Sequence, residues 1–468
     1  MIIDDYSERV EYTLTNAKNL DGVAQAEVFL GANRLLTIRS AIGKVLESKV
    51  IQDAGLGIRI LTKDQGLGFS STCDFSDKSI LEAIEEALSL SRYRRLKQDY
   101  SFTLPQSVNR ENKFYDKKLV EMIFSYDDIN EQVNQMLQET LELDPAIKEA
   151  AGPTHLVEFS KHIMNTNGLD ISEKGTYWNM ELLAVAESSK DRREGSNSSA
   201  GWKLSEIDTS FLSSHAADMA VRSLDGNKIE ANTYELILSA MSVSTFLGWL
   251  AYLTYPQNQE RNMPLLRDKI GEEIASSLMT VGHDPLRVPS PVSGAYDDEG
   301  VPTEDLCLIE NGVYKAMPLD SFYSTQFQTR SNGTGYRFQA ASGMTVYPGE
   351  LYQSEPLPLL PSIYMTAGDS TIEEMIAETR KGIYLDFLHY AYVTNGGTGD
   401  YTGILRQGTF LIENGEIKHP IQKSRLLDNI LEMAKNIEMV GPSRMAGHWR
   451  DMAMVPPVKV SKVNIIPY

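Results

Sequence analysis

The sequence predicts a mixed α/β (α+β) protein, with an α/β N-terminal domain followed by a β-rich C-terminal domain built on a mixed or barrel-like sheet. Three observations carry this prediction. Extended apolar runs and amphipathic helical stretches share the first half of the chain. An Asn-Gly turn flanked by strand-forming residues occurs twice in the second half. At 468 residues the chain is also longer than one hydrophobic core usually extends, which favours at least two domains.

The first predicted domain covers residues 1–228. It opens with a helix in SERVEYTLTNAKN and continues with two extended runs in AQAEVFLGANRLLTIRSAIGKVLESKV. The stretch GLGIRILTKDQGLGFSST indicates a hairpin, because its glycines bound two apolar runs and complete no G-x-G-x-x-G phosphate motif. An amphipathic helix is expected directly after Ser76.

A sub-boundary within this domain is expected near residues 100–126. Beyond it, INEQVNQMLQETL predicts a helix, and the long stretch HLVEFSKHIMNTNGLDISEKGTYWNMELLAVAE predicts a hairpin. The polar segment SSKDRREGSNSSAGW resembles a flexible tip. A helix in TSFLSSHAADMAVRSL then leads to the domain boundary at residues 225–233.

One stretch, residues 236–255, carries no charge over twenty positions and is long enough to cross a bilayer. It nevertheless contains several serines and threonines, and no Lys or Arg cluster flanks it to fix an orientation. We therefore interpret it as a short buried strand that runs into a core helix. Ser239 is expected near the helix N-cap and Pro256 at its end. No membrane association is predicted.

The second predicted domain covers residues 229–468 and contains a short internal repeat. The sequence LIENGVYKAMP at residues 308–318 recurs as LIENGEIKHP at residues 411–420. Both positions of Asn-Gly accept positive φ, which makes this dipeptide the strongest two-residue hairpin signal. Two similar hairpins are therefore expected in this domain.

The composition is that of a globular protein with a strongly acidic surface. Hydrophobic residues make up 42% and charged residues 23% of the chain. The 44 Lys and Arg stand against 64 Asp and Glu, which gives a formal net charge of −20. Because such a surface repels phosphate backbones, the sequence predicts no direct binding to nucleic acid.

The two cysteines, Cys73 and Cys307, lie far apart and form no C-x-x-C motif, so neither a disulfide framework nor a zinc ribbon is indicated. The N-terminal residues contain no basic region followed by an apolar stretch, so no secretory signal is predicted. These features together predict a reducing, cytoplasmic location.

Motifs for catalysis are scarce. No two of the seven histidines stand at i,i+4, and each is expected to be a surface or locally bonded residue, His155 and His162 included. The densest acidic loop holds Asp297, Asp298 and Glu299. Carboxylates this close could bind a hard cation or work as an acid–base pair. A turn is the favoured interpretation, because Asp and Gly are turn residues and the spacing of a calcium loop is absent.

Several of these segments occur in an order that resembles the TldD/PmbA family, in which PmbA is also called TldE. They are GIRILTKDQGLGFSSTCDFS before a helix, YDDEGVPTEDLCLIENGVYKAMPLDSFYS, SNGTGYR, GDYTGILRQGTFLIENGEIKHPI and a helix that ends in KNIEMVG. The resemblance covers nearly the whole chain and is most specific over residues 295–440. Each motif is weak alone, whereas their order and spacing are specific.

The resemblance implies two kinds of chain. The TldD type is a zinc metallopeptidase with His-Glu-x-x-x-His on a helix and a further cysteine ligand near the C-terminus; the PmbA/TldE type lacks these ligands. In this chain Gly248, Trp249 and Leu253 stand where His, Glu and His would be, and no cysteine follows Cys307. None of the three side chains can coordinate zinc or act as a general base. The resemblance thus implies no catalytic residues here, no metal and no cofactor.

The resemblance also implies a role. The chain is expected to be the non-catalytic partner of a TldD-type subunit, as a heterodimer, or to form a homodimer. The peptides cleaved by the complex would be unfolded or extended, such as precursors of peptide products and labile antitoxins. One alternative is an autonomous peptide hydrolase with Asp297, Asp298 and Arg337 lining its cleft. Another is a regulatory protein that acts on DNA gyrase.

Overall fold

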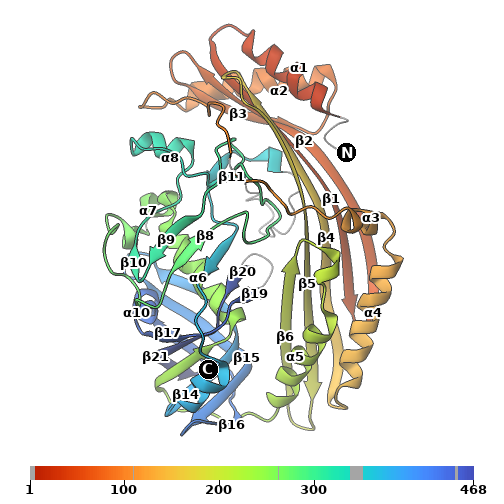
Figure 1. Ribbon diagram of the computed structural model, residues 1–468, viewed down its shortest axis with the longest axis vertical. Coiled ribbons are helices and arrows are strands. Elements are labelled where there is room, and N and C mark those ends of the chain that lie inside the picture. The colour runs from red at the N-terminus through yellow and green to blue at the C-terminus, as the bar shows by residue number, and fades with distance from the viewer. Residues whose placement is uncertain (1–5, 109, 262, 338–350, 448–451) are drawn as a thin grey trace.

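The computed structural model describes residues 6–108, 110–261, 263–337, 351–447 and 452–468. His448, one of the seven histidines, lies outside these residues. The N-terminal half is built on a six-stranded antiparallel sheet in the order β3-β2-β1-β4-β5-β6 (Figure 1). The strands are β1 (Val23–Ala41), β2 (Lys44–Thr62), β3 (Leu67–Thr72), β4 (Ile147–Asn165), β5 (Asp170–Glu187) and β6 (Arg192–Gly201).

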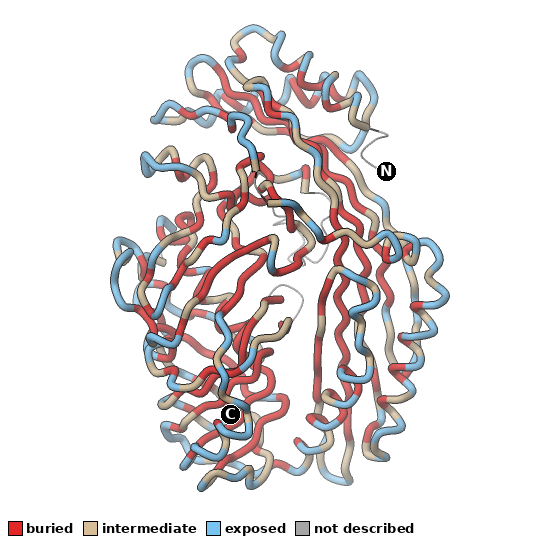
Figure 2. The backbone as a smooth tube through the Cα atoms, in the orientation of Figure 1, coloured by how far each residue is buried: buried red, intermediate tan, exposed pale blue. Residues whose placement is uncertain are grey.

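Both faces of this sheet are covered, so its central strands are buried on both sides (Figure 2). Side chains alternate between faces along a strand. On β1, Leu30 and Leu36 therefore face the helices, while Phe29 and Leu35 face segments of the C-terminal half. The helices are α1 (Ser7–Lys18), α2 (Asp77–Leu90), α3 (Lys117–Phe124), α4 (Asp127–Glu142) and α5 (Thr209–Arg222). The helices and hairpins predicted for this half are present.

The prediction of a flexible tip in SSKDRREGSNSSAGW is wrong. Most of this segment is β6, which pairs with β5 over its length. Its Ser196, Asn197 and Ser198 are at most 4% exposed. These polar side chains lie buried because they find partners: the Ser196 hydroxyl donates to Oε1 of Gln407 at 2.6 Å. A strand whose buried residues are polar carries no hydrophobic signal in the sequence.

The two histidines on β4 differ in their surroundings. His162 Nε2 lies 2.9 Å from Oδ1 of Asp170, so this residue is locally bonded. His155 is only 1% exposed and is not a surface residue. Burial lowers the pKa of His155 to about 4. Strand β4 is covered on both faces. The spacing of two histidines along the sequence gives no information about such burial.

The uncharged stretch forms a buried strand and a core helix, as predicted. Strand β7 (Asn232–Leu238) leads to α6 (Ala240–Thr254), and the Ser239 side chain caps the helix by accepting the N–H groups of Met241 and Ser242. The next helix, α7 (Pro256–Arg261), begins at the expected proline. Within the described residues, no helix combines the length and the apolarity that crossing a bilayer requires.

The C-terminal half is β-rich and contains a closed barrel, which confirms the predicted fold class. Five strands close the ring because β14 pairs with both β7 and β15. Besides β7 they are β14 (Lys381–Asn395), β15 (Asp400–Glu413), β17 (Ser424–Asn429) and β21 (Val458–Pro467). Two further strands, β16 (Glu416–Pro420) and β18 (Ile437–Val440), pair with this ring from outside.

A second sheet lies beside the barrel in the order β10-β9-β8-β13-β20-β19. Its strands are β8 (Val281–His283), β9 (Leu306–Glu310), β10 (Val313–Tyr314), β13 (Ile363–Met365), β19 (Arg444–Ala446) and β20 (Ala453–Val455). Helices α9 (Ile372–Ala377) and α10 (Ile430–Lys435) also belong to this half.

Both predicted Asn-Gly hairpins are present. The first joins β9 to β10 and the second joins β15 to β16. Asn311 and Gly312 have φ of 48° and 83°, and Asn414 and Gly415 have φ of 53° and 80°. These positive values at both central residues are the conformation that Asn-Gly favours.

Candidate functional site

The three residues that stand in place of a metal motif lie on α6. Leu253 is fully buried in the apolar core of the C-terminal half, while Gly248 and Trp249 are partly exposed. The Trp249 ring meets that of Tyr252 edge-on, with centroids 5.3 Å apart. Glycine, indole and leucine offer zinc no lone pair. Among the residues that the structure describes, no group of three or more His, Cys, Asp or Glu side chains is placed to hold a metal ion.

The acidic loop is a turn, as predicted, but a buried one. Asp297, Asp298 and Glu299 are at most 1% exposed. Oδ1 of Asp297 accepts the N–H groups of Glu299 and Val301, both at 2.9 Å, which fixes the turn. Its Oδ2 accepts the N–H of Gly335 at 2.8 Å. These contacts tie the turn to the neighbouring strand β11 (Gly335–Arg337).

Arg337 lies in the same cluster, so the structure brings the three predicted cleft residues together. Its N–H donates to Oδ2 of Asp298 at 2.9 Å. Its guanidinium is buried over the Phe29 ring, 4.3 Å from the ring centroid, and Nη2 lies 3.3 Å from Oε1 of Glu27. Burial and the nearby Arg59 lower the pKa of Arg337 to about 10.

Sequence reasoning missed the residues that face this loop from the N-terminal sheet. Arg59 on β2 donates to both carboxylate oxygens of Glu27 on β1, each at 2.8 Å, and reaches Oε1 of Glu299 at 2.9 Å. Lys161 on β4 lies 3.1 Å from Oδ1 of Asp298 and 3.7 Å from Oε2 of Glu173. One signal was present in the sequence: Glu27 and Arg59 each interrupt an apolar run, AEVFL and IRIL.

We call this set the buried charge cluster: Glu27, Arg59, Lys161, Glu173, Asp297, Asp298, Glu299, Asp320 and Arg337. It holds six carboxyl groups and three cationic groups. Burial, reinforced by Glu299, raises the pKa values of Asp297 and Asp320 well above the ordinary range of a carboxyl. Burial opposes the charge of Arg59, yet Glu27, Tyr100 and Glu299 raise its pKa. The cluster is thus held by ion pairs and hydrogen bonds, and most of its carboxyl groups are shut off from solvent.

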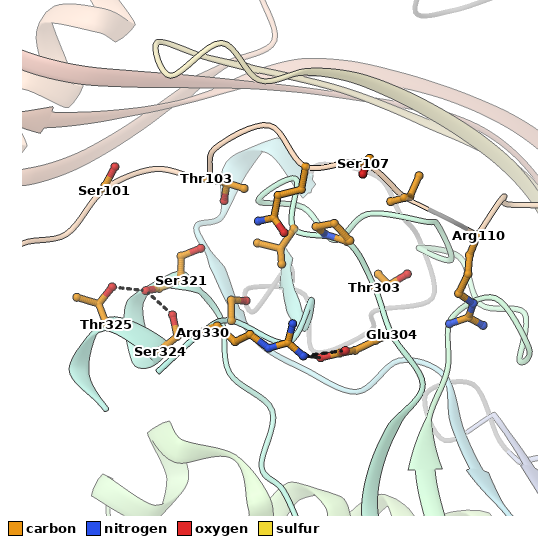
Figure 3. Close-up of a pocket in the computed structure, with 15 residues that line it drawn as sticks. Ser101, Thr103, Ser107, Arg110, Thr303, Glu304, Ser321, Ser324, Thr325 and Arg330 are labelled. Carbon is orange, nitrogen blue, oxygen red and sulfur yellow. Dashed lines mark hydrogen bonds and ion pairs between the residues drawn. The ribbon is translucent and has the colours of Figure 1, made fainter. Parts of the chain in front are cut away.

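A pocket of about 410 Å³ opens next to the cluster (Figure 3). Residues 101–108 form one side, and the other sides are the loop at 301–304, helix α8 (Ser321–Gln326) and residues 330–331. Arg330 and Glu304 meet within the pocket, with Nη2 3.3 Å and 3.2 Å from the two carboxylate oxygens. Among the residues that line this pocket, none of the three predicted cleft residues is found.

Comparisons with known proteins agree with this architecture. The chain matches three descriptions: PmbA/TldA metallopeptidase domain 1 over residues 26–91, the central domain over 123–224 and the C-terminal domain over 231–467. It is 22% identical to a metalloprotease TldD homolog of Buchnera aphidicola, over 93% of this chain and 91% of the relative.

Two solved structures share the fold. TldE from Thermococcus kodakarensis is 22% identical, with a TM-score of 0.86 that covers 98% of this chain and 100% of the other. A candidate modulator of a DNA gyrase from Thermotoga maritima is 19% identical, with a TM-score of 0.82 and the same coverage. Matches to all three family domains, spread over both halves of the molecule, lead to one conclusion: the chain belongs to the TldD/PmbA metallopeptidase family.

Proposed function

We propose that this chain is the non-catalytic subunit of a TldD-type zinc peptidase complex that cleaves unfolded or extended peptides. One observation carries the proposal: α6 holds Gly248, Trp249 and Leu253, in a family of metallopeptidases, at the positions that the family resemblance assigns to His, Glu and His. Leu253 is built into the apolar core, so it has no role at a metal.

The partner subunit supplies the zinc in this proposal. A chain that keeps the family architecture keeps a surface through which such subunits associate, and pseudo-two-fold pairing is the usual arrangement for two similar chains. This subunit then shapes a wall of the space in which the peptide is held. An extended peptide binds to such a wall through main-chain hydrogen bonds, independently of most of its side chains.

The purified chain is expected to bind no stoichiometric zinc. Its α6 offers no ligand, so a chelator such as EDTA should leave its melting temperature unchanged, because no folding free energy comes from the metal. Elemental analysis together with differential scanning fluorimetry measures both quantities. One tightly held zinc per chain, or a drop in melting temperature with EDTA, would contradict the non-catalytic assignment.

Co-expression with a TldD-type chain of the same organism is expected to give a one-to-one complex that hydrolyses extended peptides. Size-exclusion chromatography with light scattering measures the stoichiometry, and cleavage of a fluorogenic unfolded peptide measures the activity. Activity should need both chains and should vanish when the first motif histidine of the partner is replaced by alanine. Triple replacement of Gly248, Trp249 and Leu253 by alanine, serine and methionine in this chain should leave activity within about twofold, because none of them is a ligand.

Two results would refute the proposal. One is cleavage of the same peptide at the same rate by the TldD-type chain alone. The other is failure of the two chains to co-elute at about 1–10 μM, because a complex with a standard-size interface is expected to have a dissociation constant below that concentration. In that case the structural likeness to a candidate modulator of a DNA gyrase would be the better basis for proposing a function. Capture of gyrase by this chain without a peptidase partner would then support a regulatory role.

A further inference from the structure

The pocket beside the buried charge cluster has the size and the chemistry of a ligand site. Its volume of about 410 Å³ lies within the range of about 300–1,000 Å³ that small-molecule sites occupy. Eight of its fifteen lining residues are serine or threonine, and none is aromatic. Such a lining selects polar ligands that make hydrogen bonds.

The orientation of the hydroxyl groups decides what kind of polar ligand fits. Ser324 and Thr325 donate to the carbonyl of Ser321 at 3.0 Å and 2.8 Å. Ser331 and Thr303 likewise donate to main-chain carbonyls outside the pocket, both at 2.8 Å. A hydroxyl that already donates its hydrogen bond to a carbonyl has only its oxygen lone pairs left for a ligand. These four hydroxyl groups can therefore only accept hydrogen bonds from a ligand, so they favour a ligand that donates them.

The two arginines that line the pocket do not favour an anionic ligand. Its two arginines are already neutralised, because Arg330 pairs with Glu304 and Arg110 donates to both oxygens of Asp284 at 2.6 Å and 2.7 Å. Behind α8 lie two carboxyl groups of the cluster, but Glu299 is paired with Arg59 and burial raises the pKa of Asp320, so Glu304 is the carboxylate that a cation would meet. Asp320 accepts the N–H of Tyr323, and Glu299 accepts the N–H of Ser321, both at 2.7 Å.

The Arg330–Glu304 pair is the contact that a ligand would exchange. The Arg330 side chain is 82% exposed and that of Glu304 is 43% exposed, so the bond between them is readily given up to solvent or to another cation. Glu304 is the less exposed of the two and directly follows Thr303 in its loop. A cation that replaces Arg330 there gains the carboxylate and the neighbouring oxygens together.

We infer that this pocket binds the cationic end of a peptide, an ammonium or guanidinium group, with Glu304 as its counter-ion and Thr303, Ser324 and Thr325 as hydrogen-bond acceptors. Arg330 pairs with Glu304 in the structure, and the ligand displaces it. The choice of a peptide as the ligand rests on the proposed function. The binding itself is a property of this chain and needs no partner subunit.

Isothermal titration of the purified full-length chain with three probes tests the inference. Trialanine amide carries only an N-terminal ammonium, N-acetyl-lysine amide carries only a side-chain ammonium, and N-acetyl-trialanine amide is neutral. At least one cationic probe should bind, and the neutral probe should bind at least about tenfold more weakly. Whichever cationic probe binds tighter identifies the source of the ammonium group as the peptide terminus or a basic side chain.

Two substitutions should act in opposite directions. Glu304→Gln should weaken binding of the cationic probe about tenfold, because the counter-ion is lost, while Arg330→Gln should strengthen it about threefold, because the competing cation is gone. If the ion pair had only a structural role, both substitutions would change the affinity for the cationic probe in the same direction. Glu310→Gln is the matched control, since it removes an exposed carboxylate that pairs with Lys315 instead. Circular dichroism confirms that each variant is folded.

The inference is overturned by any of three results: no heat and no thermal shift with either cationic probe at about 10 mM, equal binding of the neutral probe, or changes of the same sign in Glu304→Gln and Arg330→Gln. The complex with a TldD-type chain is measured separately. If that complex fails to form while the cationic probes bind as described, the proposed function is refuted and the inference about the pocket is supported. If the complex is active and the probes do not bind, only the inference about the pocket is refuted.

Discussion

Replacing Arg59 by methionine is expected to lower the free energy of unfolding by about 3–5 kcal/mol. The guanidinium is 4% exposed and pairs with Glu27 and Glu299, which are 0% and 1% exposed. Without it, Glu299 loses its cationic partner, and Glu27 keeps only the contact with Arg337 at 3.3 Å, beside the other carboxyl groups of the cluster. Urea denaturation followed by tryptophan fluorescence measures the loss.

Arg95→Met is the control for this experiment. Arg95 also pairs with an aspartate, Asp64, but the two side chains are 67% and 57% exposed. An ion pair this exposed contributes about 0–1 kcal/mol, so the variant should unfold almost as the parent does. If Arg59→Met and Arg95→Met differed by less than 1 kcal/mol, the cluster would contribute nothing to holding the two halves together.

Leu250→Asp is expected to destabilise the protein by about 4 kcal/mol or more, or to prevent folding. Leu250 lies on α6, is 2% exposed and packs in the apolar core of the C-terminal half, where an ionised carboxyl has no partner. Tyr252→Asp is the matched control on the same helix, because Tyr252 is 37% exposed.

The comparison separates a buried core helix from one that faces lipid. Soluble yield and melting temperature should fall sharply for Leu250→Asp and by only a few degrees for Tyr252→Asp. If both variants lost stability equally, Tyr252 would matter as much as the buried Leu250, and the difference in exposure between the two positions would not explain the result.

Periodicity and turn chemistry were enough to predict most elements of the fold. The helix after Ser76, the long hairpins and the two Asn-Gly turns are local features, since each depends on residues within a few positions of one another. The core helix at residues 240–254 was predicted for the same reason, from its cap at Ser239 and the proline that ends it. β6 was missed, because its polar residues are buried against partners that lie far away in the sequence.

The candidate site could not be predicted to the same extent. The sequence placed Asp297, Asp298 and Arg337 together only through a family resemblance, and it suggested an open cleft. Their burial depends on Glu27, Arg59 and Lys161, which lie in strands of the other half. Nothing local to the acidic loop indicates that it is covered, because acidic turn residues are usually solvated. The pocket was missed for the same reason: its walls come from four separate segments.

The long sequence separation within the buried charge cluster has a consequence for synthesis on the ribosome. Arg59 can pair with Glu27, 32 residues away, as soon as β1 and β2 have formed, whereas Glu299 lies 240 residues further on. At about 5–20 residues per second, that interval lasts about 12–48 s. During this time the inner face of the sheet, with Phe29, Leu35 and the Glu27–Arg59 pair, has no cover from the C-terminal half. The nascent chain therefore passes through a stage at which a chaperone, or a premature contact with another nascent chain, competes for that face.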